Sequence, residues 1–102
     1  MSDDPVAGKK IRWTYDDGPV KGKTFEHSFT NDGKVSYSEP GVFASEPSIA
    51  YQVARIDDAV YVVSYLATSG WTLTTVVDEK SRKIVSFASN EKQLVTQHGR
   101  LV

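Results

Sequence analysis

His27 is the side chain with the clearest potential for chemistry, because it stands between Phe25 and Phe29 in a strictly alternating segment. Histidine is the residue most easily tuned for proton transfer near neutral pH. If His27 transfers a proton, Tyr15 or Tyr65 would donate a hydrogen bond to the oxyanion that develops in the substrate. The alternative is a core histidine whose ring nitrogens bond to a tyrosine hydroxyl or a carbonyl group.

Most aromatic side chains have the same parity as His27, so in a sheet they would face the same side. Tyrosine hydroxyls that face an interior need hydrogen-bond partners, whereas an inert core would more simply use Phe and Leu. The pattern favours a pocket for a small planar or apolar ligand with a polar edge, and a filled core is the alternative. The residues predicted to contact the ligand are Trp13, Tyr15, Phe25, His27, Tyr37, Tyr51, Arg55, Tyr61, Tyr65 and Trp71.

Arg55 is the charged member of this set. It shares the parity of Tyr51 and Val53 near the end of a strand, where its guanidinium could pair with a ligand carboxylate. The alternative is an arginine that extends into water at the end of a strand.

Metal and thiol chemistry are not expected. The chain has no cysteine, which excludes disulfides, thiolate catalysis and zinc-thiolate sites. His27 and His98 are too far apart in the sequence to form a metal-binding motif. We therefore expect neither a metal nor a cofactor, and the carboxylates mostly stand where turns require them.

Charge and hydropathy limit the partners. The 102 residues include 12 basic and 13 acidic side chains, and a net charge of -1 argues against a nucleic-acid-binding protein. No apolar run approaches the roughly 20 residues of a membrane span. The first residues do not resemble a signal peptide, so we expect a cytoplasmic protein.

Short alternating segments rich in β-branched and aromatic residues predict an all-β fold. Asn31-Asp32-Gly33-Lys34 is typical of a hairpin turn, and residues 39–47 are irregular. Short connections require antiparallel neighbours, and closure would remove both exposed edges. We predict a flexible tail over residues 1–8 and one small up-and-down barrel of about eight strands over residues 9–102. The predicted strands lie near residues 10–15, 23–30, 35–38, 48–56, 59–67, 71–78, 83–89 and 93–98.

Four motifs occur in order between about residues 10 and 90. They are Trp13-Thr14-Tyr15-Asp16-Asp17-Gly18, Thr30-Asn31-Asp32-Gly33-Lys34-Val35-Ser36-Tyr37, Asp58-Ala59-Val60-Tyr61-Val62-Val63-Ser64-Tyr65 and Thr68-Ser69-Gly70. This order resembles the MoaF-like and phenolic acid decarboxylase group of calycin (lipocalin-like) barrels. The resemblance implies a small barrel that contains a ligand cavity.

The decarboxylases of that group use an aromatic pair on the first strand, an arginine after the third strand and a glutamate after a Val-Ser-aromatic stretch. Here the aromatic pair becomes Trp13 and Tyr15, residues 41–47 contain no arginine, and Ala67 stands near the glutamate position. The resemblance therefore favours a MoaF-like protein over a decarboxylase.

Three functional hypotheses remain open. The leading one is a small-molecule-binding barrel with a small organic ligand. The second is a lyase or isomerase with His27 as its proton-transfer group, so the sequence leaves enzymatic activity undecided. The third is a structural or interaction module with a filled core. Because Val60, Val62 and Leu66 form an apolar face opposite Tyr61, we expect a homodimer to cover them.

Overall fold

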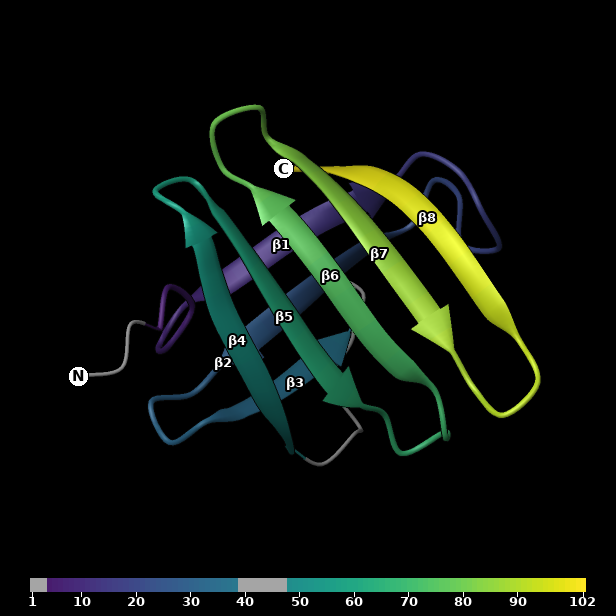
Figure 1. Cartoon of the computed structure of the whole chain (residues 1–102), viewed down its shortest axis with the longest axis horizontal. Coiled ribbons are helices and arrows are strands. Elements are labelled where there is room, and N and C mark those ends of the chain that lie inside the picture. Colours follow the sequence, from purple (N-terminus) through teal and green to yellow (C-terminus); the bar gives the residue numbers. More distant parts are fainter. Residues whose placement is uncertain (1–3, 39–47) are drawn as a thin grey trace.

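The structure is a closed, antiparallel β-barrel in which each strand pairs with the next and the last pairs with the first (Figure 1). It is a computed structural model that describes residues 4–38 and 48–102. This architecture confirms the predicted all-β up-and-down barrel. The strands are β1 (Lys10–Tyr15), β2 (Thr24–Phe29), β3 (Lys34–Ser38), β4 (Ile49–Asp57), β5 (Val60–Leu66), β6 (Thr72–Asp78), β7 (Lys83–Ser89) and β8 (Leu94–Leu101).

The barrel has two walls that cross each other: β4–β8 lie in front in Figure 1, and β1–β3 run behind them at an angle. Within β4–β8, strand β6 pairs along its full length with both β5 and β7. The seams between the walls are shorter. In the described residues, β3 meets β4 only at Lys34↔Ala50 and Val35↔Ile49. At the other seam, β1 meets β8 from Trp13↔Leu101 to Tyr15↔Gly99.

Local sequence explains both the hairpins and the closure of the barrel. Gly33 has a φ of 84°, which the Asp32-Gly33 turn requires and which glycine adopts without strain. Gly99 is needed for a different reason, because a Cβ atom there would lie 2.3 Å from the backbone oxygen of Thr14. A side chain at this position would push β1 away from β8 and open the seam.

Alternating side chains fill the interior, as the parity of the sequence predicts. Odd-numbered residues of β1, β2 and β5 are buried, except for Ile11 and Phe25, which are partly buried. In β7 the even-numbered residues are buried instead, because of the register set by the β6–β7 turn. The buried apolar cluster comprises Val6, Trp13, Tyr15, Phe29, Val35, Tyr51, Tyr61, Val63, Tyr65, Val77 and Ile84. The described residues form no helix, and so none long and apolar enough to cross a membrane.

One end of the barrel is closed by the segment that precedes β1. Val6 is completely buried, and the Oδ1 atom of Asp4 accepts hydrogen bonds from the backbone N–H groups of Val6 and Ala7. The hydroxyl of Tyr51 donates to Asp4 Oδ2 at 2.7 Å. We expected residues 1–8 to be a flexible tail, but from Asp4 onwards this segment is packed, since it supplies an apolar side chain to the barrel end.

Candidate functional site

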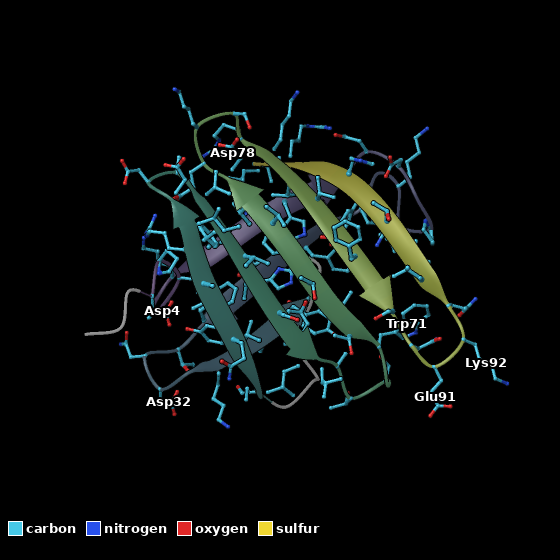
Figure 2. The ribbon with its side chains drawn as sticks, in the orientation of Figure 1. Asp4, Asp32, Trp71, Asp78, Glu91 and Lys92 are labelled. Carbon is cyan, nitrogen blue, oxygen red and sulfur yellow. The ribbon has the colours of Figure 1, made fainter. Side chains whose placement is uncertain are left out.

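A cavity of about 210 Å³ lies inside the barrel. It is at the end opposite the one that the segment around the buried Val6 closes. Figure 2 shows Trp71 near the end that carries the β7–β8 turn residues Glu91 and Lys92, whereas Asp4 and Asp32 lie at the other end. An apolar cavity with a few converging polar groups is typical of a small-molecule site. The described residues that line it are Tyr15, Val20, Phe25, His27, Tyr37, Tyr65, Ser69, Trp71, Leu73 and Gln97.

The structure gathers many of the predicted ligand-contacting residues around this cavity. Those that line it are Tyr15, Phe25, His27, Tyr37, Tyr65 and Trp71. They come from β1, β2, β3, β5 and the β5–β6 connection, so residues far apart in the sequence meet through the barrel topology.

Four predicted contact residues do not line the cavity. Trp13 is buried against His27, with ring centroids 4.1 Å apart. Tyr51 bonds to Asp4 at the closed end, and Tyr61 is buried away from the cavity. Inward parity places a side chain inside the barrel but does not choose its level along the axis. How far along the barrel axis a side chain lies depends on its position in the strand, because each residue advances the strand by about 3.3 Å.

Arg55 is the clearest correction among the four. It is exposed, and its Nη1 atom donates hydrogen bonds to the backbone oxygens of Asp57 and Asp58 in the β4–β5 turn. The register of β4 against β5 shifts between Arg55 and Asp57, and such an irregularity redirects side chains at a strand end. Arg55 therefore stabilises a turn and does not supply a positive charge to the cavity.

His27 lies in the interior with aromatic rings around it. Its Nε2 atom is 2.9 Å from the hydroxyl oxygen of Tyr65, and its ring stacks on Trp13 and on Tyr37. Burial lowers the pKa of His27 to about 3, because the charged imidazolium would lose its hydration. Burial also raises the pKa of Tyr65 well above 10. Both groups are therefore neutral at physiological pH, and the bond joins two neutral partners.

Tyr15 belongs to a second buried polar chain. Its hydroxyl lies 3.0 Å from Ser86 Oγ, which in turn lies 2.7 Å from Thr75 Oγ1. The Tyr15 ring packs edge-on against Phe25, with centroids 5.8 Å apart. The hydroxyl is thus already engaged by the β6–β7 wall, and the ring provides the contact surface of Tyr15 in the cavity.

Sequence reasoning missed Val20, Ser69, Leu73 and Gln97. Gln97 is the most informative of them because it is polar and only 6% exposed. It packs below the β1–β2 connection, where a Cβ on Gly18 would come within 2.7 Å of it. The signal that could have identified Gln97 is its pairing with Ser86 on β7: because Ser86 faces inward, the odd-numbered residues of β8, including Gln97, face inward as well.

Among residues 4–38 and 48–102, the charged side chains lie outside the cavity. None of the described lining residues carries a charge at neutral pH, given that His27 is neutral. His98 instead lies on the exterior beside Asp17, whose pKa is lowered first by the hydrogen bond that the His98 backbone N–H donates to Oδ1 at 2.7 Å and then by the contact between Nδ1 and Oδ2, 2.8 Å apart. Over residues 4–38 and 48–102, no group of three or more His, Cys, Asp or Glu side chains could hold a metal ion.

Comparison with known proteins identifies the fold and no more. A solved structure described as "a putative beta-lactamase from Burkholderia vietnamiensis" superimposes with a TM-score of 0.78. The match covers 100% of this chain and 98% of that chain at 17% sequence identity. No protein-family model matches the sequence, and no curated protein matches it either. The similarity establishes a shared small barrel fold.

Proposed function

We propose that this protein is a small-molecule-binding barrel of the MoaF-like type, whose ligand is small, planar or apolar, and polar along one edge. The observation that carries the proposal is the aromatic cavity of about 210 Å³ between the two walls. Trp71, Phe25 and Tyr37 offer ring surfaces, while His27 and Gln97 offer polar groups. This combination of flat apolar surface and few polar atoms suits a molecule with the same two properties.

The cavity volume limits the size of the ligand. A protein cavity of about 150 Å³ is large enough to bind benzene. The cavity here, at about 210 Å³, therefore suits a single ring with a small substituent. Most drug-sized ligands occupy pockets of roughly 300–1,000 Å³ and would be too large for this site without rearrangement.

Binding is favoured over the lyase or isomerase hypothesis by the state of His27. A histidine whose pKa lies near 3 is a weak base at neutral pH, because few substrates would transfer a proton to it. The hydroxyl of Tyr15, the other proposed catalytic group, is bonded to Ser86. These two observations support a hydrogen-bonding role for the polar groups of the cavity.

An NMR titration of the labelled protein with single-ring aromatic compounds tests the proposal. We expect saturable shifts of the Trp71 indole N–H and of the backbone amides of Ser69, Leu73 and Gln97, which line the cavity. Amides near Val6, at the closed end, should not shift. The absence of saturable shifts with every compound, or shifts scattered over the outer surface, would contradict the proposal.

A pair of tryptophan substitutions separates the cavity from the surface. Leu73→Trp places a large ring in the cavity wall and should weaken binding at least tenfold. Leu94→Trp is the matched control, because Leu94 is 74% exposed on β8 and does not line the cavity. Binding should be unchanged in this variant. Equal affinities in the two variants would place the bound compound elsewhere.

A further inference from the structure

The two walls of the barrel present different surfaces to the outside. The outward residues of β1–β3 include the charged side chains of Lys10, Arg12, Glu26 and Lys34, as expected of an antiparallel sheet with one side in water. Arg12 Nε and Glu26 Oε2 form an ion pair there at 2.7 Å. The outer side of β4–β8, which faces the viewer in Figure 1, instead has three neighbouring rows of residues without Lys, Arg, Asp or Glu.

Strand pairing defines these three rows, which together we call the β4–β8 face. The middle row comprises Gln52, Ser64, Thr74, Phe87 and Thr96, each paired with the next. The rows on either side comprise Leu66, Thr72, Ser89 and Leu94, and Ala54, Val62, Val76, Val85 and His98. A sheet face in contact with water normally carries charges, as the β1–β3 wall does, so this composition indicates that the β4–β8 face is covered.

The β4–β8 face is large enough for a protein interface. Five strands about 4.8 Å apart, with outward residues about 7 Å apart along each strand, give the three rows an area of about 500 Å². Two such faces in contact would bury about 1,000 Å², which is where specific interfaces begin. Leu66, Phe87 and Leu94 are 68%, 41% and 74% exposed on this face, and they would gain most from the burial.

The same face carries an exposed phenyl ring and a hollow that can take it. The hollow has a volume of about 340 Å³ and lies over β4, β5 and the start of β6. It is lined by Ala50, Gln52, Ser64, Tyr65, Leu66 and Thr72. A cavity of about 150 Å³ is large enough to bind benzene, so the hollow has room for the ring of a Phe87 side chain.

Strand register places the ring and the hollow where a two-fold symmetric pair needs them. Ser64, Thr74 and Phe87 belong to one row, so β5 and β7 lie at equal distances on either side of β6. A two-fold axis that runs along β6 therefore sets β7 of one copy over β5 of the other, and Phe87 over Ser64 in the hollow. Because the symmetry repeats this contact, both rings are buried at once.

We propose that two copies of this chain associate through their β4–β8 faces, with Phe87 of each copy seated in the hollow of the other. A second copy suits this face because neither side brings a charge that would lose its hydration without a partner. The sequence placed the contact on β5, and strand pairing extends it to β7 and supplies its geometry.

An exchange of charges across the contact tests this inference by sedimentation equilibrium. Phe87→Lys puts a charge into each hollow, and Gln52→Glu puts a charge into each lining, so either change should raise the dimer dissociation constant at least tenfold. In an equal mixture of the two variants, one contact joins the opposite charges and the other keeps the original ring in the original hollow. The mixture should therefore dimerise at least tenfold more tightly than either variant alone.

Ser28→Lys is the matched control, because Ser28 lies on the outer side of β2 in the charged wall. This variant should associate as the unmodified protein does. Restored association in the mixture also shows that both variants fold, since unfolded chains would not pair through a sheet face.

Two outcomes would overturn the inference. A monomer at every concentration of the unmodified protein would show that this face is not paired with a second copy, and would leave it for a different protein. A dimer that Phe87→Lys leaves intact, or that the mixture of variants does not restore, would show that the copies do not meet through Phe87 and the hollow.

Discussion

At the residue scale, the burial of His27 links the stability of the fold to pH. The pKa of His27 is about 3 in the folded protein and near 6.5 in an unfolded chain. Between these values the unfolded state binds more protons, so the free energy of unfolding falls as pH falls. We expect a loss of about 2 kcal/mol between pH 7 and pH 5, measured by urea denaturation at both values.

Two variants identify the histidine responsible for this loss. His27→Phe should remove most of the difference in unfolding free energy between pH 7 and pH 5. His98→Gln should retain it, since His98 lies on the exterior beside Asp17. If His27→Phe and the unmodified protein lose stability equally, His27 is not the titrating group.

The sequence could predict the aromatic part of the site but not all of its polar part. Parity alone placed His27, Tyr37 and Tyr65 inside the barrel, because alternation decides the face of a strand. It could not separate these residues from Tyr61, whose level along the axis depends on strand register. Gln97 was missed because a polar residue in a strand usually faces water, and only its pairing with Ser86 shows that it faces inward.

At the scale of elements, the segment before β1 acts as the plug of the barrel. Val6→Ala should lower the free energy of unfolding by about 2 kcal/mol, because the removed methyl groups are fully buried. Val102→Ala, at a 57% exposed position, should change it by less than about 0.5 kcal/mol. Chemical denaturation measures both. Similar effects of the two substitutions would show that the plug does not contribute to stability.

The strands themselves were largely predictable. Lys10–Tyr15 and Lys83–Ser89 match the predicted ranges, and the other boundaries move by one to a few residues. The largest difference is β8, which continues to Leu101. Its extension could not be inferred locally, because His98-Gly99-Arg100 looks like the end of a strand. Gly99 instead belongs to the seam, where close approach of Thr14 leaves no room for a side chain.

At the scale of the whole molecule, the homodimer expected from the sequence stays a prediction. On the outer face of β5, Val60 and Val62 are half-buried and Leu66 is 68% exposed. We expect sedimentation equilibrium to give a dimer and Leu66→Lys to shift it towards the monomer, whereas Val102→Lys should not. A monomer at the highest soluble concentration of the unmodified protein would contradict this prediction.

The short seams between the two walls have a consequence for whatever occupies the cavity. Tyr15 and His27 belong to the β1–β3 wall, while Tyr65 and Gln97 belong to the β4–β8 wall. We expect a molecule bound between the two walls to resist their separation and to be released when they separate, because it contacts both. The rate at which the two walls separate would then also set how long the ligand stays bound.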